Sequence, residues 1–570
     1  MALIEEHPTP YHCITQPRCR LCQFELEDGD AVYAVCYHDS CYEFRFYSVT
    51  LAFLDATLYS FEPSAREKMR RTRYIRQELS RNLQRTSKWP RELPAELWHM
   101  VAGYLLEDCA TLTAQEQVYD CDNTGESELD LTRSVFASFV KVDGLYYVKD
   151  LHNTAEASTG MQTCVLPAAT MLANQEKKQA DKDLFVAQDH LGIRRFVFVS
   201  AKHCEEWCRN PPNVPGAWWK HIPCQAMSAT VCIKRDGLKV RDIKRLQTKP
   251  STLSSHVGWQ VPVATPPAIV DILTTRTLNE YPNDLRMRFF DCNAPGTMGY
   301  SVAVDGARVL AILTHKQDQK TDASLFEGVN SPICQWMYMP INQGEYLTDI
   351  CRRAGCLVIK TETLGMTFTT NRGRTAVFGL YGHKNIGIRR LAALSPNPSR
   401  VYFNDTNSWL NQHSVALMGF EQGKAIAPFD NLPKLPVAIS NYPSSISSEV
   451  WLHTSCSMAH LTEIQPCVDK TRTHQPIIGM LLHYADGHRE CVGQFRLDWA
   501  SELIMLSETD NVFICGKRTG EGRGYVSTIT ASAPVGDSSE RWLHIEQTGT
   551  LEWWFSLRHS VLYYNGVRLN

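Results

Sequence analysis

The sequence contains no long hydrophobic run. Across its 570 residues, no apolar stretch approaches the ~18–20 residues that a membrane-spanning helix requires. The segment Met1–Tyr11 also lacks the basic and then apolar pattern of a signal peptide, and it carries Glu5, Glu6 and prolines instead. We therefore expect a cytoplasmic or nuclear protein in a reducing compartment, with no membrane association.

An excess of charge of one sign is also missing. The formal net charge of -3 argues against a surface that binds nucleic acid along the whole chain. The segment from Arg66 to Lys88 is an exception, because it is basic and carries only Glu67 and Glu78 as acids. It lacks interleaved aromatic side chains that could stack on bases, so we interpret it as the solvated face of a linker helix and consider nucleic-acid binding unlikely.

Familiar catalytic motifs are missing too. The sequence has no Gly-x-Ser-x-Gly, no Walker loop, no His-Glu-x-x-His and no strand-linked dinucleotide fingerprint. His203, Cys204 and Cys208, with His221 and Cys224, could form a metal site, but their spacing favours buried cysteines and surface histidines. We therefore expect a protein that is not an enzyme.

The twenty cysteines are scattered through a large chain, unlike those of a short secreted disulfide scaffold. One group has metal-ligand spacing: Cys19, Cys22, His38 and Cys41 form C-x2-C-x15-H-x2-C. Two closely spaced pairs can supply the four ligands of a tetrahedral zinc ion. Cys13 and Cys36 are alternative candidates, and Cys36 could replace Cys41.

The segment between the two pairs predicts a hairpin, because Asp28-Gly29-Asp30 separates two apolar runs. The first pair of candidate ligands would lie on a tight turn, a hairpin would follow, and the second pair would lie at the start of a helix. This order resembles one half of a LIM domain or a treble-clef finger. The resemblance implies a structural zinc ion, since protein atoms fill all four positions and leave none for a reacting water.

The stretch Leu93–Leu106 predicts a short amphipathic helix, with Pro94 near its first turn and apolar residues at helical spacing. Leu93-Pro94-Ala95-Glu96-Leu97-Trp98 followed by Val101, Tyr104 and Leu105 resembles the opening helix of an F-box. The resemblance implies docking on the adaptor of a cullin–RING ubiquitin ligase. The residues that would face that adaptor are Leu93, Pro94, Leu97, Trp98, Val101 and Leu105.

The rest of the F-box pattern, a Leu-rich second helix and a Val-Cys-Lys-x-Trp segment, is absent. The polar and acidic segment Cys109–Leu129 is expected to be a linker. The alternative interpretation of Leu93–Leu106 is a connecting helix that packs on a neighbouring domain.

From Val135 onward, Asp-Gly and Asn-Gly pairs recur between apolar segments. These dipeptides supply the positive φ angles of tight hairpin turns, so the pattern predicts antiparallel meanders. The pairs are Asp143-Gly144, Asp236-Gly237, Asp305-Gly306, Asp486-Gly487 and Asn565-Gly566.

An internal repeat aligns Leu364–Gly379 with Ile478–Gly493 without a gap, and each copy predicts a hairpin with a glycine turn. The first copy, with its lead-in Gly344–Ile350, resembles a jacalin-type β-prism repeat. The C-terminal Gly-x-x-x-Asp loop that such lectins use for sugar is not in place. Trp218-Trp219, Trp336 and Trp553-Trp554 could be sugar platforms or packed core residues.

These patterns predict a mostly β protein of antiparallel sandwich or β-prism-like domains, with a small N-terminal zinc-finger-like and helical region. The expected segments are a finger at 1–60, a helical F-box-like part with an acidic linker at 61–128, and β domains at 129–330, 331–426 and 427–570. The arrangement resembles a class of long fungal proteins with a degenerate F-box. We expect a non-enzymatic adaptor that binds protein partners, and the alternative is a lectin-like carbohydrate-binding protein.

Overall fold

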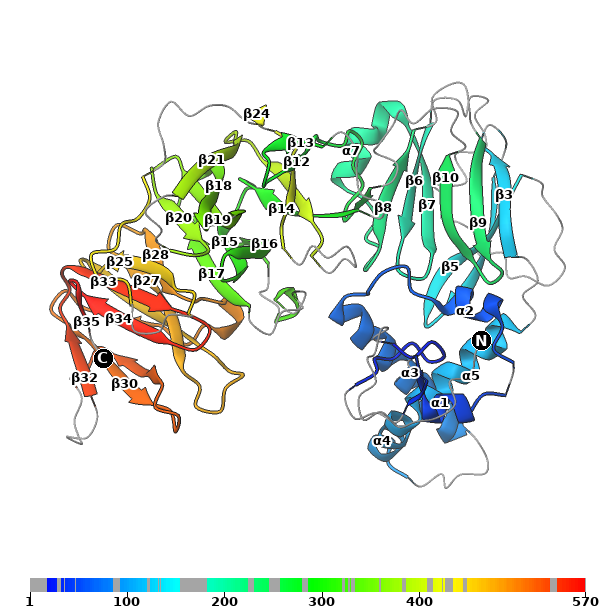
Figure 1. Ribbon diagram of the computed structural model, residues 1–570, viewed down its shortest axis with the longest axis horizontal. Helices are drawn as coiled ribbons and strands as arrows, with labels where there is room; N and C mark the ends of the chain where they lie inside the picture. Colours follow the sequence, from blue (N-terminus) through cyan, green and yellow to red (C-terminus); the bar gives the residue numbers. More distant parts are fainter. Residues whose placement is uncertain are drawn as a thin grey trace. The chain divides into compact units, whose positions relative to one another are not determined.

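The computed structural model divides into two compact units, Met1–Thr265 and Pro266–Asn570 (Figure 1). Antiparallel strands dominate and helices are few, which confirms the predicted fold class. The structure describes residues 18–27, 32–34, 36–46, 48–85, 93–119, 124–131, 133, 135–153, 182–223, 230–245, 257–278, 285–319, 323–326, 329, 334–357, 360–381, 386–406, 414–422, 424–425, 434–443, 449–533 and 541–568.

The first unit begins with a small hairpin and helices and continues as β structure. Its helices are α1 (Asp39–Glu43), α2 (Leu51–Thr57), α3 (Ala65–Arg85), α4 (Ala95–Tyr104), α5 (Leu106–Val118) and α7 (Cys204–Arg209). Its strands are β1 (Val32–Ala34), β2 (Tyr37–His38), β3 (Thr124–Asp130), β4 (Phe136–Val142), β5 (Leu145–His152), β6 (Lys182–Gln188), β7 (Ile193–Ser200), β8 (Trp218–Ile222), β9 (Thr230–Asp236), β10 (Val240–Arg245) and β11 (Gly258–Trp259).

The strands of this unit pair as β1-β2, β4-β5, β10-β9-β3 and β11-β8-β6-β7, and every pairing is antiparallel where its register is defined. Side chains of the larger strands share one core, which includes Leu129, Val148, Leu184 and Ile233. Leu184 and Val186 of β6 face this core and Phe185 and Ala187 face a second one, because successive side chains of a strand point to opposite faces.

Helices α1 to α5 are grouped at one end of these sheets (Figure 1). Two cations hold them there. The buried ammonium group of Lys239 donates to the carbonyl oxygen of Ala56 at 2.6 Å, and Arg241 donates to the carbonyl oxygen of Leu58 at 2.7 Å. Both acceptors lie at the end of α2, where helix carbonyls have no partner within the helix. The helical part is therefore joined to the β part by charge-assisted hydrogen bonds.

The described residues of the second unit form β structure with two short 3-10 turns, Ala323–Leu325 and Leu497–Trp499. Its first half contains β12 (Ile269–Asp271), β13 (Arg276–Thr277), β14 (Arg286–Cys292), β15 (Thr297–Asp305), β16 (Arg308–Lys316), β17 (Gln335–Pro340), β18 (Leu347–Leu357), β19 (Lys360–Thr370), β20 (Thr375–Phe378), β21 (Ile386–Ala393), β22 (Ser399–Asn404), β23 (Leu417–Phe420) and β24 (Lys424–Ala425). Its second half contains β25 (Leu452–Ser457), β26 (Leu461–Val468), β27 (Ile477–Tyr484), β28 (Arg489–Gly493), β29 (Ile504–Met505), β30 (Val512–Arg518), β31 (Gly524–Thr530), β32 (Arg541–Ile545), β33 (Thr550–Phe555), β34 (Ser560–Tyr564) and β35 (Val567–Arg568).

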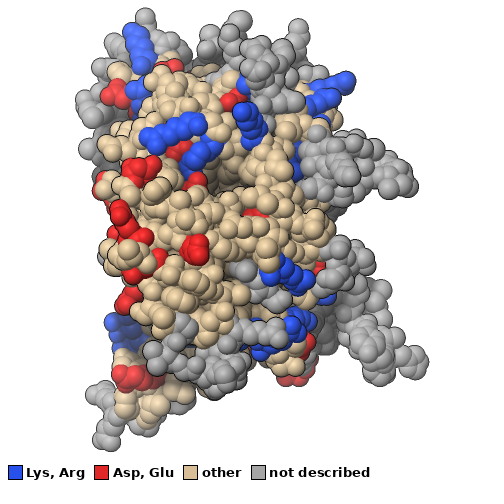
Figure 2. All heavy atoms as spheres, turned by 90° about the vertical axis from the view of Figure 1, so that its left-hand side faces the viewer, with Lys and Arg blue, Asp and Glu red and all other residues tan. Residues whose placement is uncertain are grey.

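In this unit the strand orders are β13-β12-β23-β22-β14, β16-β15-β17, β20-β19-β18-β21-β24, β25-β33-β34-β35 and β29-β26-β27-β31-β30-β32, with β28 beside β27. One continuous apolar core runs through these sheets and includes Phe290, Phe368, Met480 and Trp553. On the face shown in Figure 2, basic and acidic side chains of the described residues are interspersed with uncharged ones.

The predicted repeat is a pair of equivalent hairpins, β19–β20 and β27–β28. Its glycines mark close approaches of the backbone. A Cβ atom added to Gly365 would lie 2.0 Å from the carbonyl oxygen of Phe378, and one added to Gly479 would lie 2.1 Å from that of Gln494. The glycine near the start of each copy is therefore required by packing, whereas the glycine in the middle, Gly373 or Gly487, serves the turn through its positive φ angle.

Two of the five Asp-Gly and Asn-Gly pairs have positive φ angles at both residues, whereas in the other three only the glycine does. Asp143 and Gly144 have φ angles of 47° and 83°, and Asn565 and Gly566 have φ angles of 49° and 76°. Two consecutive positive φ values are what a type I′ turn needs. These turns join β4 to β5 and β34 to β35.

The expected acidic linker at Cys109–Leu129 is wrong. Helix α5 occupies Leu106–Val118, and β3 begins at Thr124. The buried residues of α5 are Ala110, Thr111, Gln115 and Val118. Because most of these side chains are small or polar, the segment carries little of the apolar periodicity by which helices are identified.

The five expected domain segments are finer than the observed division, which falls within the segment 129–330, and their boundaries stay predictions. Among the helices that the structure describes, none is long and apolar enough to cross a membrane.

Candidate metal centre and the adjoining helices

The four predicted ligands come together in the first unit. Cys19 and Cys22 lie on a tight turn closed by a hydrogen bond from the amide of Gln23 to the carbonyl oxygen of Cys19 (2.9 Å). His38 ends β2 and directly precedes α1, which contains Cys41. All four residues are buried, and their ligand atoms lie within 4.8 Å of one another. The structure thus places a group that could hold a metal ion where the spacing predicted one.

The distances between donors fit a tetrahedral ion. Zn–S bonds of about 2.3 Å and Zn–N bonds of about 2.0 Å require about 3.5 Å between a sulfur and a nitrogen ligand. The Nδ1 atom of His38 lies 3.4 Å from the Sγ atom of Cys22 and 3.7 Å from that of Cys41. Little movement is therefore needed for the cluster to hold a metal ion.

Contacts with neighbouring backbone groups orient His38 and favour the thiolate form of Cys22. The Nε2 atom of His38 lies 3.2 Å from the carbonyl oxygen of Glu25, so an Nε2–H donor there leaves the Nδ1 lone pair facing the sulfur atoms. The amide of Phe24 donates to the Sγ atom of Cys22 at 3.4 Å, which favours the thiolate. This arrangement is the one that metal-binding histidine and cysteine need.

The side chains of the cluster also shift one another's pKa values. Hydrogen bonds from the Cys22 and Cys41 thiols hold the pKa of Cys19 far below its usual value. Burial raises the pKa of Cys22 well above its usual value. Burial alone would lower the pKa of His38, but hydrogen bonds with Cys19 and Cys41 outweigh it and raise that pKa to about 11. A metal ion would displace the protons that these groups share.

One arginine links the metal cluster to the β part of the unit. The Arg71 side chain, on α3, donates to the carbonyl oxygen of Cys22 at 2.8 Å and to the carboxylate of Asp143 at 2.7 Å. Asp143 lies in the β4–β5 turn. The guanidinium of Arg71 also lies 4.7 Å from the ring centroid of Phe24. A single buried side chain therefore connects the turn of the two cysteines, a long helix and a hairpin.

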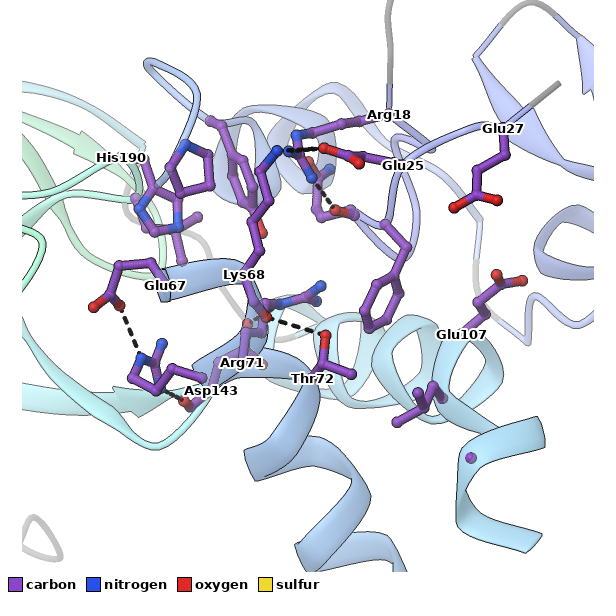
Figure 3. Close-up of a pocket in the computed structure, with 18 of the residues that line it drawn as sticks. Arg18, Glu25, Glu27, Glu67, Lys68, Arg71, Thr72, Glu107, Asp143 and His190 are labelled. Carbon is purple, nitrogen blue, oxygen red and sulfur yellow. Dashed lines mark hydrogen bonds and ion pairs between the residues drawn. The ribbon is translucent and has the colours of Figure 1, made fainter. Parts of the chain in front are cut away.

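A cavity of about 540 Å³ lies beside these contacts, with His190 on one side and Glu27 and Glu107 on the other (Figure 3). The cations on its wall are paired with acids, as Arg71 is with Asp143 and Lys68 with Glu25. These paired charges hold the finger and α3 together, and they form no arrangement of nucleophile and base. This network leaves no signal in the sequence because its partners are far apart along the chain.

Helix α4 presents its apolar residues in two directions. Trp98 and Ala102 are buried, with 2% and 0% of their surface exposed, on the side that packs against α3. Leu97, Met100 and Tyr104 are 42%, 58% and 85% exposed. Their spacing of three, four and seven residues puts them on one face of the helix.

The structure therefore separates the six residues that the F-box resemblance named. Leu97 and Pro94 are exposed, Leu93, Val101 and Leu105 are half-buried, and Trp98 lies in the core. The F-box resemblance implies that Trp98 faces a partner, but in this structure its indole is buried inside the protein. Met100 and Tyr104 were not among the six, although both are exposed beside Leu97.

The second group of cysteines and histidines does not assemble as a metal cluster among the described residues. Cys204 and Cys208 are buried, and the Nε2 atom of His221 lies 3.0 Å from a carboxylate oxygen of Asp183. His203 is exposed, and Cys224 lies outside the described residues. Burial of both cysteines and exposure of His203 agree with the interpretation that the sequence favoured, but His221 is buried and is not a surface histidine.

The tryptophans considered as sugar platforms are mostly core residues. Trp219, Trp336, Trp553 and Trp554 are each at most 5% exposed, and only Trp218 is half-buried. Trp553 donates its indole N–H to Ser560, and Trp554 donates to Ser440. Their rings are therefore not available as exposed stacking surfaces.

Comparison with known proteins finds no protein family that matches the chain and no curated protein that matches it. A solved structure entitled "Crystal structure of Lamprey immune protein" is a distant neighbour, with 11% sequence identity and a TM-score of 0.14. The match covers 50% of this chain and 91% of that one. A TM-score this low supports no inference about fold or function, so the F-box and jacalin resemblances stay predictions.

Proposed function

We propose that this chain is a non-enzymatic adaptor whose first unit docks on a protein partner through the exposed face of α4. The observation that carries this proposal is the row of Leu97, Met100 and Tyr104, which is exposed while the opposite face of the same helix is packed. Large apolar side chains exposed in a row are typical of protein-binding surfaces. The F-box resemblance of this helix makes the adaptor of a cullin–RING ubiquitin ligase the partner, in the cytoplasm or nucleus.

We also propose that the bound metal is zinc and that its role is structural. Three sulfur donors and one imidazole match the chemistry of structural zinc sites. The cysteines pack in one core with Phe53, Ile75 and Ala110, which belong to α2, α3 and α5. Zinc would thus fix the finger against the helices that position α4.

Elemental analysis tests the metal. The purified chain should contain about one zinc ion per molecule, and Cys22→Ser should lose it. Cys36→Ser is the matched control, because Cys36 is also in this finger but does not belong to the cluster. Equal zinc content in wild type and Cys22→Ser would refute the assignment.

A direct binding measurement tests the docking face. The full chain should form a complex with the purified cullin–RING adaptor in size-exclusion chromatography. The double substitution Leu97→Arg and Met100→Arg should abolish the complex while leaving the melting temperature nearly unchanged, because both side chains lie at the surface and are 42% and 58% exposed.

His99→Arg provides the control, since His99 is exposed on another face of α4. It adds one of the two positive charges that the double variant adds and should leave the complex intact. A wild-type chain that fails to bind the adaptor would remove the ubiquitin-ligase proposal. A double variant that still binds would show that another surface is responsible.

A further inference from the structure

Helix α3, with 21 residues the longest of the described helices, carries a stripe of basic and amide side chains. Residues three or four positions apart lie on one face of a helix, and positions 66, 70, 73, 77, 81 and 84 keep this spacing along the whole of α3. At a rise of 1.5 Å per residue, the stripe is about 27 Å long. Its members, which we call the arginine stripe, are Arg66, Arg70, Arg73, Gln77, Arg81 and Gln84.

The arginine stripe faces solvent, and the other side of α3 is fixed to the unit. All members of the stripe are exposed except Arg70, whose side chain is 30% exposed. On the opposite side of the helix, Arg71 and Ile75 are buried, and Ile75 packs in the core that contains the candidate metal ligands. The stripe is therefore held in place before a partner arrives, which reduces the entropy lost on binding.

The positive charge of this face exceeds what neighbouring acids neutralise. Arg70 pairs with Glu67 at 2.8 Å, and Arg81 pairs with Glu78 at 2.6 Å. Three further arginines are exposed and have no acidic partner among the described residues. They are Arg66, Arg73 and, at the end of the helix, Arg85. Like charges at this spacing destabilise a helix, so an anionic partner would relieve a repulsion that the protein leaves uncompensated.

The composition of the stripe favours nucleic acid as this partner. Protein interfaces usually have an apolar or aromatic core, and no member of the stripe is apolar or aromatic. Arginine donates to phosphate oxygens and to guanine, and glutamine pairs with adenine. The absence of aromatic side chains from this face argues against stacking on the bases of single strands. Contacts with the groove of a duplex need no such stacking.

The shape of α3 selects between the two kinds of duplex. The major groove of DNA is about 12 Å wide and admits an α-helix, whereas that of an RNA duplex is too deep and narrow for side chains to read. We propose that α3 binds double-stranded DNA by lying in the major groove. Gln77 faces the base edges, and Arg66, Arg73 and Arg85 contact phosphates.

Binding of this kind is confined to one helix, which agrees with the net charge of -3 for the whole chain. Phosphate contacts carry no sequence information, so we expect a duplex of mixed sequence to bind. The proposal goes beyond the docking face of α4 and does not rest on it.

Fluorescence anisotropy of the full chain tests the proposal. The probe is a labelled, mixed-sequence DNA duplex of about two helical turns, or ~20 base pairs. Its affinity should fall between about 50 and 200 mM salt with a log–log slope of about -3, because three unpaired arginines each contribute about -0.9. An RNA duplex of the same sequence, single-stranded DNA and polyglutamate should bind at least about tenfold more weakly.

Methylation of the probe tests where the helix lies. The N7 atoms of guanine are exposed in the major groove. Bound protein should therefore protect them from dimethyl sulfate.

Paired substitutions separate binding from stability. Arg66→Glu with Arg73→Glu should weaken binding by about tenfold or more, and Arg66→Gln with Arg73→Gln should reduce the salt slope by about two. A misfolded variant would lower the active fraction without changing the slope. The matched control is Arg518→Glu with Arg558→Glu, which makes the same charge change at exposed positions of the second unit and should keep the affinity and slope of the wild type.

Four results would overturn the proposal. They are a wild-type chain that does not bind the DNA duplex, an unchanged salt slope in the double glutamine variant, guanines that stay reactive in the complex, and a competitor that binds as tightly as the DNA duplex. Tight binding of polyglutamate would assign the stripe to an acidic protein partner instead.

Discussion

At the scale of single residues, burial decides how the polar groups of this protein behave. His315 is an example in the second unit: its Nε2 atom lies 2.8 Å from the hydroxyl oxygen of Ser301, and its ring stacks on Phe326. Burial lowers the pKa of His315 from 6.5 to about 4, although Asp498 raises it slightly. The neutral imidazole is therefore the form that the folded protein accepts.

This shift predicts that His315 makes the protein less stable in acid. Between pH 6.5 and about 4 the unfolded chain binds a proton at His315 and the folded chain does not, so stability falls as pH decreases through this window and levels off below it. The full effect is roughly 3 kcal/mol. His315→Gln should flatten this part of the profile, which urea unfolding at several pH values would measure. Identical pH profiles for the two proteins would contradict the prediction.

The four predicted metal ligands show which residue-level features sequence can predict. Cys19, Cys22, His38 and Cys41 were identified because closely spaced pairs are themselves the signal. The groups that hold them were not identified. Arg71 and Asp143 are 72 residues apart, and the carbonyl oxygen of Glu25 is a backbone atom, so neither contact leaves a pattern in the sequence.

At the scale of elements, the consecutive helices α4 and α5 each have one buried face and one exposed face. The pattern of α4 predicted a helix, but periodicity alone does not say which apolar side chains point inward. Packing against α3 decides that Trp98 is buried and Tyr104 is exposed. Helix α5 was missed because it buries Ala110, Thr111 and Gln115, which are too small or too polar to look like a core.

Substitutions on the two faces of α4 should therefore change stability by very different amounts. Trp98→Ala removes a fully packed indole and should destabilise the first unit by about 3–5 kcal/mol. Tyr104→Ala removes a ring that is 85% exposed and should change stability by less than about 0.5 kcal/mol. Thermal unfolding of the full chain measures both. A stable Trp98→Ala variant would show that the indole is not part of this core.

The repeated hairpins give a second prediction for an element. Gly479→Ala would bring a methyl group within 2.1 Å of the carbonyl oxygen of Gln494, so the backbone must shift. We expect a loss of about 1–3 kcal/mol, as for other overpacked sites. Gly520→Ala is the control, since nothing lies within 4 Å of its added Cβ atom. Equal urea midpoints for the two variants would refute the close approach seen between β27 and β28.

At the scale of the whole molecule, the dominance of β structure followed from short-range signals. Turn dipeptides and alternating strands specify hairpins locally, and the structure contains hairpins at both copies of the repeat. Which strands meet across a sheet depends on contacts between distant residues. Strand β14 pairs with β22 and β25 pairs with β33, and each connection spans about a hundred residues. Hairpins were therefore predictable and sheet order was not.

The concentration of helices in one unit leads to the last prediction. Helices α1, α2, α3 and α5 share a core with the predicted metal ligands, whereas the second unit has its own continuous apolar core. Because a small metal site gains much of its folding energy from the ion, removing zinc with a strong chelator should reduce the helical part of the far-ultraviolet circular dichroism. The β signal should persist, since the core that supports most strands contains none of the four ligands. Added zinc should restore the helical signal, while magnesium, which prefers oxygen ligands, should not. A spectrum unchanged by the chelator, from protein shown to have lost its zinc, would mean that the helices stand without the metal.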